Sequence, residues 1–268
     1  FQRCHAIHQG GPAGLMIKGN SIDINSDIGE GFPFDRELLS YISSANICCG
    51  AHAGSLDLMK KTIFMALEEG VAAGAHPGYP DRDSFGRCET GLDTCTITDN
   101  VVCQVAAFNE YIVRMGSSMS HLKLHGALYN RAASDYGLMH SIVKAVVSFT
   151  GRIPVYTLAG SESMEAIADA GGIPVGEAFA DRGYNPDGTL MQRGIPGAVI
   201  EDVELVASRV LDFARGKAPG FMHVGADTIC IHGDTSGALA MALRIRQKLN
   251  EEGISIVSKF SVQTSFPG

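Results

Sequence analysis

Beyond residue 20, the hydrophobic and polar positions alternate between short β-rich runs and amphipathic stretches of helical period. The predicted strands cover residues 21–29, 45–51, 71–77, 120–127, 153–159, 173–181, 227–233 and 254–260. The predicted helices cover residues 35–44, 55–70, 98–116, 135–149, 161–171, 201–216 and 237–249. Strand followed by helix, repeated about eight times, indicates parallel strands joined by crossovers. We expect an α/β fold, a closed (β/α) barrel that is complete or slightly irregular, with an open doubly wound sheet as the alternative.

Capping residues support some of the helix boundaries. Ser55 and Thr98 are the predicted N-caps of the second and third helices. Asp234 or Thr235 fits the same role for the last helix, because a side-chain oxygen there accepts a hydrogen bond from a free amide of the first turn. Capping does not explain His232, which stands just before that helix.

The beginning of the chain differs from the rest. Residues 1–19 show neither the periodicity of a core element nor the apolar stretch of a secretory signal. We expect them to be a flexible extension, and we expect residues 20–268 to form a single barrel domain. No apolar run approaches the roughly 18 residues that a membrane span needs, so no membrane contact is expected.

The composition is typical of a folded globular protein, with 45% hydrophobic and 19% charged residues. The net charge is −8 and the basic residues are scattered, which argues against a nucleic-acid partner. The seven cysteines form no CxxC pair, so we interpret them as small buried residues of a protein in the reducing cytoplasm. A catalytic thiol is the alternative interpretation.

Unusual polar residues follow most of the predicted strands. In a parallel barrel the carboxyl ends of all strands open on one face, so these residues converge although they are distant in sequence. The group consists of Asp27, Glu30, His52, His76, Asp81, Arg87, Lys123, His125, Glu177, Asp181, Arg182, His232 and Asp234. Four histidines on one rim indicate a functional site, and fixed cations beside them suit a carboxylate or phosphate ligand.

A divalent metal is one possible occupant of this rim. Asp27 with two histidines, His52 and His76, would suit an ion that keeps an open coordination position. No HxxxH or HExxH pair on one helix supports it, however. No GxxxxGK[ST] loop or strand-linked GxGxxG occurs either, so short motifs give no sign of nucleotide binding.

Six longer motifs carry a family resemblance over residues 22–259: DINSDIGEGF, ANICCGAHAG, GVAAGAHPGYPDRDSFGR, LKLHGALYN, EAFADRGYNPDGTL and CIHGD. With them the chain resembles the LamB/YcsF family of lactam-utilisation proteins, described as the A subunit of ATP-dependent 5-oxoprolinase. The resemblance implies a barrel of the glycoside hydrolase/deacetylase type. It also implies opening of 5-oxoproline, or a related lactam, at the expense of ATP with Mg²⁺, together with two partner subunits.

The implied chemistry suggests roles for the rim residues. The catalytic candidates are Asp27, His52, His76, Lys123, His125 and His232. The substrate-binding candidates are Glu30, Arg87, Asp181, Arg182 and Asp234. Asp27 or a neighbouring histidine would deprotonate water, and Lys123 would stabilise a developing oxyanion or phosphate. The candidates for proton transfer to the ring nitrogen are His52, His76 and His125. Arg182 would hold the substrate carboxylate, and Asp234 would orient His232.

Two other functions compete with lactam opening. A metal-dependent hydrolase or deacetylase would use the same barrel without ATP, and it predicts a tightly bound divalent ion. A non-catalytic binding subunit predicts instead that the polar rim residues can be replaced without loss of activity. The number of titratable groups on the rim argues against the latter.

Overall fold

The computed structural model describes residues 20–217, 225–233 and 237–260. The expected extension at residues 1–19, as well as Asp234 and Thr235, lie outside these described residues. The strands are β1 (Ser21–Ile28), β2 (Ser44–Cys48), β3 (Ala72–His76), β4 (Leu122–Lys123), β5 (Pro154–Leu158), β6 (Ile173–Phe179), β7 (Thr228–Cys230) and β8 (Ser255–Ile256). All their pairings are parallel.

The sheet closes on itself. Strands β2 to β7 are neighbours in chain order, and β1 pairs with β2 on one side and β7 on the other, which makes a ring of seven strands. Strand β8 pairs only with the first residues of β1, where Ser21 lies opposite Ser255 and Ile22 opposite Ile256. The expected closed and slightly irregular barrel is therefore confirmed, and the open doubly wound sheet is wrong.

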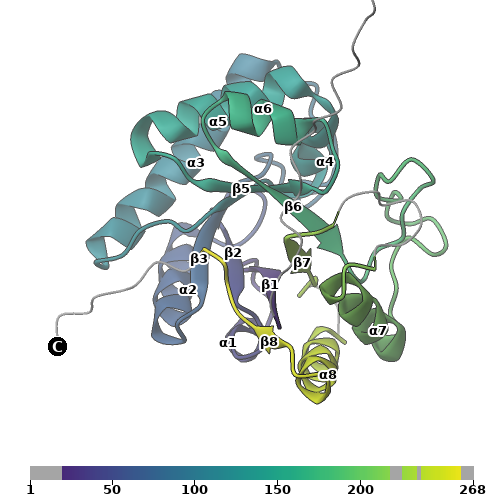
Figure 1. Cartoon of the computed structure of the whole chain (residues 1–268). Coiled ribbons are helices and arrows are strands. Elements are labelled where there is room, and N and C mark those ends of the chain that lie inside the picture. The colour runs from purple at the N-terminus through teal and green to yellow at the C-terminus, as the bar shows by residue number, and fades with distance from the viewer. Residues whose placement is uncertain (1–19, 218–224, 234–236, 261–268) are drawn as a thin grey trace, which may run out of the picture.

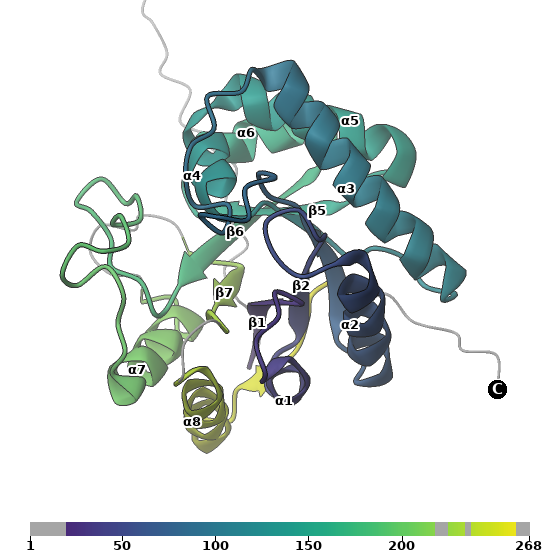
Figure 2. The ribbon, with the colours of Figure 1, turned by 180° about the vertical axis from the view of Figure 1, so that it is seen from behind.

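Helices surround the barrel (Figure 1). They are α1 (Asp35–Leu39), α2 (Leu56–Glu68), α3 (Thr94–Arg114), α4 (Gly126–Ser134), α5 (Tyr136–Thr150), α6 (Ser163–Asp169), α7 (Val203–Ala214) and α8 (Ala238–Glu251). Helices α3 to α6 lie on one side of the strands, and α1, α2, α7 and α8 lie on the other, as the reverse view in Figure 2 also shows. Within the described residues, none of the helices combines the length and the apolar character needed to cross a bilayer.

Helix starts follow the capping residues closely. Ser55 accepts a hydrogen bond from Leu58 N, as predicted. Helix α3 begins earlier than expected, because Asp93 is its N-cap and accepts from Thr96 N. The predicted cap Thr98 is wrong, since its hydroxyl donates to the Thr94 carbonyl inside the helix.

The clearest error of the sequence-based assignment is helix α4. The run at 120–127 is expected to be a strand, yet only Leu122 and Lys123 pair, and the chain turns into a helix at Gly126. Gly126 has a φ of 56° and packs against Gly86, where an added Cβ would lie 2.5 Å from the carbonyl oxygen. The helix at 35–44 is also shorter than predicted and ends at Leu39.

Strand β1 separates two environments. Ile22, Ile24 and Ile28 belong to the hydrophobic core between the sheet and the helices. Asp23 accepts hydrogen bonds from Thr228 of the neighbouring strand β7 and from Tyr156 of β5, which does not pair with β1, so the alternate residues of β1 point inward. Parallel barrels commonly fill this interior with Val, Ile and Leu. A polar interior is therefore the feature that positions the site.

Asp35, the first residue of α1, gives a test of this packing. Its carboxylate accepts a hydrogen bond from Gly29 N, and burial raises its pKa from 3.8 to about 6. Because the folded state binds the proton more tightly, this stabilisation is complete below pH 3.8 and is lost as pH rises through about 6. Asp35→Asn keeps an acceptor without the charge. Its free energy of unfolding should exceed that of wild type by on the order of 2 kcal/mol at neutral pH and match it near pH 4.

Urea unfolding at several pH values measures this difference. The control is Asp57→Asn, because Asp57 is exposed on α2. A difference between Asp35→Asn and wild type that stays constant with pH would contradict the buried-acid interpretation.

Candidate active site

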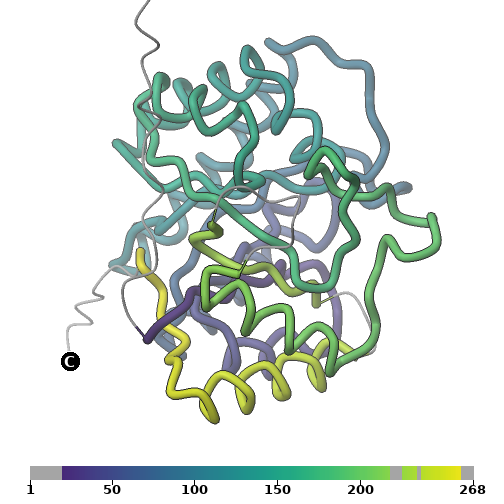
Figure 3. Tube along the Cα trace, turned by 45° about the vertical axis from the view of Figure 1, so that its right-hand side comes forward, coloured from purple at the N-terminus to yellow at the C-terminus, as the bar shows by residue number. Residues whose placement is uncertain are grey.

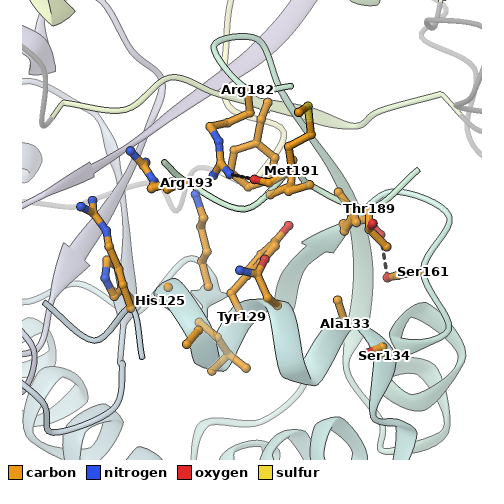
Figure 4. A pocket seen from close by; sticks show the side chains of 18 of the residues that line it. His125, Tyr129, Ala133, Ser134, Ser161, Arg182, Thr189, Met191 and Arg193 are labelled. Atoms are coloured by element: carbon orange, nitrogen blue, oxygen red, sulfur yellow. Dashed lines mark hydrogen bonds between the residues drawn. The ribbon is translucent and has the colours of Figure 1, made fainter. Parts of the chain in front are cut away.

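A cavity of about 780 Å³ opens at the carboxyl ends of the strands. The predicted site residues that line it are Asp27, Glu30, His76, Arg87, Lys123, His125, Arg182 and His232. His52 and Asp181 are buried directly behind it, where His52 stacks on His125 and Asp181 contacts His232. Figure 4 shows His125 and Arg193 at one side of the cavity and Thr189 and Ser161 at the other. The predicted convergence is thus observed for these ten residues, whereas the carboxylate of Asp81 does not line the cavity and accepts from Ser84 N.

The wall opposite the barrel comes from the long segment between β6 and α7. This segment projects beside α7 in Figures 2 and 3. Its two arms are joined by isolated antiparallel bridges, Arg182 with Val199 and Tyr184 with Leu190. Residues 187–193 from this segment line the cavity.

An ion cluster forms the floor of the cavity. Lys123 Nζ lies 3.0 Å from Asp27 Oδ1 and 2.9 Å from Glu177 Oε1. The ammonium also contacts Asn25 Oδ1 at 3.2 Å and Cys230 Sγ at 3.1 Å. An ammonium has three N–H donors, so these four neighbours already use its hydrogen-bonding capacity. Its position favours holding Asp27 and Glu177 in place, and the predicted contact with an oxyanion or phosphate stays a prediction.

The charges on this floor keep each other ionised. Burial alone would raise the pKa of Asp27, but its contacts with His76 and Lys123 outweigh burial and hold the pKa well below the ordinary 3.8. Burial would likewise lower the pKa of Lys123, but the carboxylates of Asp27 and Glu177 raise it well above 10.5. Asp27 is therefore a carboxylate at neutral pH, although only 8% of the residue is exposed.

A chain of hydrogen bonds orients Asp27 from below. Ser120 Oγ lies 2.9 Å from His121 Nδ1, and His121 Nε2 lies 2.8 Å from Asn46 Oδ1. The amide oxygen of Asn46 only accepts, so His121 Nε2 carries the proton and Nδ1 accepts from the serine hydroxyl. Asn46 Nδ2 then donates to Asp27 Oδ1 at 2.8 Å and to Asn25 Oδ1 at 2.7 Å. Oδ1 is thereby fixed, and Oδ2 is the oxygen left for chemistry.

His76 and His125 lie above Asp27. His76 Nε2 is 3.3 Å from Asp27 Oδ2 and 3.0 Å from His125 Nδ1. The remaining nitrogen of each ring contacts a backbone carbonyl. His76 Nδ1 lies 2.9 Å from the Lys123 carbonyl oxygen, and His125 Nε2 lies 2.9 Å from the Phe85 carbonyl oxygen. Carbonyl oxygens only accept, so these two contacts fix the ring tautomers.

Glu30 joins His52 to this group. Its Oε1 lies 3.2 Å from His52 Nε2 and 3.4 Å from His125 Nδ1. The rings of His52 and His125 stack with centroids 3.7 Å apart and planes at 2°. Burial lowers the pKa of His52 to about 3, and it also holds the pKa of His125 well below 6.5. Both rings are consequently neutral near pH 7.

His232 has a carboxylate partner that differs from the predicted one. Its Nδ1 lies 2.8 Å from Asp181 Oδ2 and 3.0 Å from Oδ1, and its backbone N–H donates to Asp181 Oδ2 at 3.0 Å. Burial would raise the pKa of Asp181, but the charge and hydrogen bonds of His232 outweigh it and lower the pKa below 3.8. Asp181 thus orients His232, while Asp234 lies outside the described residues.

The arginines of the cavity differ in their surroundings. Arg182 Nε donates to the Ala198 carbonyl at 3.0 Å and Nη2 to that of Met191 at 2.5 Å, so its guanidinium holds the projecting segment together. Arg87 and Arg193 line the cavity, and the Arg87 guanidinium lies 4.8 Å from the centroid of the Phe85 ring. The predicted contact of Arg182 with a substrate carboxylate stays a prediction.

Comparison with known proteins shows which family the chain belongs to. A model of the LamB/YcsF family matches residues 22–264. The chain belongs to the LamB/YcsF family. A relative from Thermococcus onnurineus, named as the A subunit of 5-oxoprolinase, is 43% identical over 247 residues, which cover 88% of this chain and 96% of the relative. The expected family membership is confirmed.

Solved structures agree with the fold. A crystal structure of a lactam utilization protein from Thermus thermophilus has a TM-score of 0.80 at 35% identity, covering 88% of this chain and 99% of that one. The catalytic domain of a peptidoglycan N-acetylglucosamine deacetylase from Eubacterium rectale has a TM-score of 0.51 at 11% identity, covering 96% and 97%. The second likeness concerns the fold alone, and it confirms a barrel of the deacetylase type.

Sequence reasoning missed several residues that build the floor. Asn25, Asn46 and His121 are not among the candidates, and Glu177 is only noted at a strand end. Polar residues at every second position of a buried strand are the signal that would have found two of them. His121 alternates with Lys123 and His125, as Asn25 alternates with Asp23 and Asp27.

The ion cluster can be tested by removing its cation. Lys123→Met leaves the carboxylates of Asp27 and Glu177 buried without their partner, which should lower the free energy of unfolding by about 3–5 kcal/mol. Adding Glu177→Gln should restore part of the loss, because one uncompensated charge disappears. Urea unfolding at pH 7 measures both effects. Lys144→Met, at an exposed position of α5, is the control, and stability of Lys123→Met equal to wild type would contradict the cluster.

Proposed function

We propose that this chain is the lactam-opening subunit of an ATP-dependent 5-oxoprolinase, a hydrolase that acts on the cyclic amide of 5-oxoproline and forms glutamate. The names of its relatives supply the substrate class. The observation that carries the proposal is the ionised Asp27 on the floor of a cavity that also contains the His232–Asp181 pair. A base and a proton donor are the two groups that amide hydrolysis requires.

The reaction needs activation because an unstrained lactam is a poor electrophile. ATP supplies it by phosphorylating the amide oxygen, which releases ADP. Water then adds its oxygen to the ring carbon, and the C–N bond breaks, which leaves an acyl phosphate. A second water hydrolyses this acyl phosphate to the side-chain carboxylate of glutamate and releases the phosphate. The ring nitrogen takes up a proton and becomes the amino group of glutamate.

Asp27 is the base in this scheme. Asn46 and Lys123 hold its Oδ1, so Oδ2 is the oxygen that accepts a proton from water. His232 is the proton donor to the ring nitrogen in its doubly protonated form. Its Nδ1–H is bonded to Asp181, and the proton on Nε2 passes to the ring nitrogen, which leaves a neutral ring. Phe179 stacks beside the His232 ring, with centroids 5.6 Å apart, and limits its orientation.

The substrate carries a carboxylate and, once activated, a phosphate. The cavity offers the guanidinium groups of Arg87 and Arg193 for these anions, and Arg182 adds its charge from the wall. Arginine suits both ligands because its planar N–H groups match two oxygens at once.

Partner subunits and the nucleotide complete the proposal. The relatives are named as the A subunit of their enzyme, which supports assembly with further subunits. We assign ATP with Mg²⁺ to the assembled enzyme, in the cytoplasm, with the activated lactam reaching Asp27 in this chain.

The direct test measures glutamate release from 5-oxoproline by the purified chain. Four arms are compared, with and without ATP and Mg²⁺, and with and without the two partner subunits. Release that needs ATP and the partners is expected. Release without ATP would contradict the proposal and favour a metal-dependent amide hydrolase of the same barrel.

Substitutions in the assembled enzyme test the assigned roles. Asp27→Asn should lower kcat by at least about 10²-fold, because an amide cannot accept the proton. Asp181→Asn should also lower kcat by about 10²-fold or more, since it no longer fixes the His232 tautomer. Circular dichroism checks that both variants fold. The exposed Asp57→Asn should leave the rate unchanged, and near-normal turnover by Asp27→Asn would remove Asp27 from the mechanism.

A further inference from the structure

The histidines beside Asp27 turn ring nitrogens toward one another. His76 Nδ1 donates its hydrogen to the Lys123 carbonyl, so Nε2 is the nitrogen directed at His125. His125 Nε2 donates to the Phe85 carbonyl, so Nδ1 is the nitrogen directed at His76. These two nitrogens lie 3.0 Å apart. With Glu30 and His52 they form a group whose ligand atoms face a common point.

Two carboxylates converge on the same place. Glu30 Oε1 lies 3.4 Å from His125 Nδ1, and Asp27 Oδ2 lies 3.3 Å from His76 Nε2. Ionised carboxylates only accept hydrogen bonds. His52 Nε2 lies 3.2 Å from Glu30 Oε1, and the other ring nitrogen of His52 is buried without a hydrogen-bond partner. The group is therefore rich in negative and lone-pair atoms.

Three contacts in this group have the spacing of atoms bound to one metal ion. Atoms bound to one ion at roughly 2.0–2.2 Å lie about 2.9–3.5 Å from each other in tetrahedral or octahedral geometry. The contacts between His76 and His125, between His125 and Glu30, and between Glu30 and His52 measure 3.0, 3.4 and 3.2 Å. One ligand atom from each of these four residues lies within 4.8 Å of all the others.

We propose that Glu30, His52, His76 and His125 bind a divalent transition-metal ion, separate from the Mg²⁺ that accompanies ATP. A shared proton would satisfy only the pair of His76 and His125. A divalent ion also attracts the carboxylate of Glu30. Because the rings of His52 and His125 stack in parallel planes, one of the two rings must turn when the ion binds.

The ligand chemistry selects the kind of ion. Three imidazoles and one carboxylate suit Zn²⁺, Co²⁺, Ni²⁺ or Mn²⁺ better than Mg²⁺ or Ca²⁺, which prefer oxygen ligands. A second group, formed by Asp27, Cys230 and His232, is less suitable because the Lys123 ammonium contacts both Asp27 and Cys230. The set also differs from the sequence-based one, in which Asp27 is a ligand beside His52 and His76.

This assignment deepens the proposed function and rests on it only for its chemical role. Asp27 remains the base, since Asn46 and Lys123 hold its Oδ1. An ion at the four ligands supplies a Lewis acid at the edge of the cavity, next to Asp27 Oδ2.

The test is metal binding by the chain alone, without lactam, ATP or partners. The purified chain is first treated with a chelator and dialysed. It is then titrated with Zn²⁺, and binding is measured by calorimetry. A separate titration with Co²⁺ is followed by visible absorption, which reports nitrogen ligands. One ion per chain is expected, and excess Mg²⁺ should not displace it. Glu30→Gln, which preserves shape, and His125→Ala should each weaken binding at least about 100-fold. His140→Ala is the matched control and should bind as wild type does, because His140 of α5 is not one of the clustered ligands and its ring stacks on Tyr136.

Several outcomes would overturn the assignment. These are absence of saturable Zn²⁺ binding, equal affinity in Glu30→Gln and wild type, or equal loss in His140→Ala. Thermal unfolding of each metal-free variant separates loss of ligands from loss of fold, and Glu30→Gln is retained if His125→Ala does not fold. Because no substrate is present, failure here leaves lactam opening untouched, and failure of the glutamate assay leaves the metal site untouched.

Discussion

The buried contact between the Lys123 ammonium and the carboxylates of Asp27 and Glu177 is the interaction on which the rest of this site depends. Moving three charges out of water costs several kcal/mol each, and mutual attraction offsets that cost only if the geometry is fixed. The barrel fixes it, because the three residues come from β4, β1 and β6 and meet on the axis. Ionisation of Asp27 is thus a property of the closed ring rather than of one strand.

The polar interior below the ion cluster follows from the same constraint. Asn25 Oδ1 accepts a hydrogen bond from Lys123, and Asn25 Nδ2 donates one to the Thr228 hydroxyl. That hydroxyl in turn donates to Asp23. Ser43 and Ser44 also donate to Asp23, whose pKa is raised by burial. A buried network in which some polar groups lack a partner would destabilise the fold. The ion cluster therefore requires the hydrogen bonds of Asn25, Thr228 and Asp23 beneath it. The barrel interior consequently serves as the support of the site.

The architecture and the location of the site could be predicted because both follow from alternation. Parallel strands joined by helices bring the strand ends to one face, and this placed Asp27, His76 and His125 together. Contacts across a loop could not be predicted. His232 was paired with its sequence neighbour Asp234, but topology brings it to Asp181, which lies 51 positions away. The polar interior of the strands was readable in part, because Asp23, Asn25 and Asp27 alternate with isoleucines along β1, but which of these side chains contact Lys123 depends on the closed barrel.

The central claim is that Asp27 is held ionised by Lys123 on the floor of the cavity. Carbon-13 NMR of the aspartate side-chain carboxyls, with the Asp27 signal assigned by its absence in Asp27→Asn, measures this directly in metal-free chain. The account predicts that the signal stays at the carboxylate position from pH 7 down to pH 4 in wild type. It also predicts that the signal shifts toward the protonated position at neutral pH in Lys123→Met. An Asp27 carboxyl that is protonated near pH 6 in wild type would contradict the account.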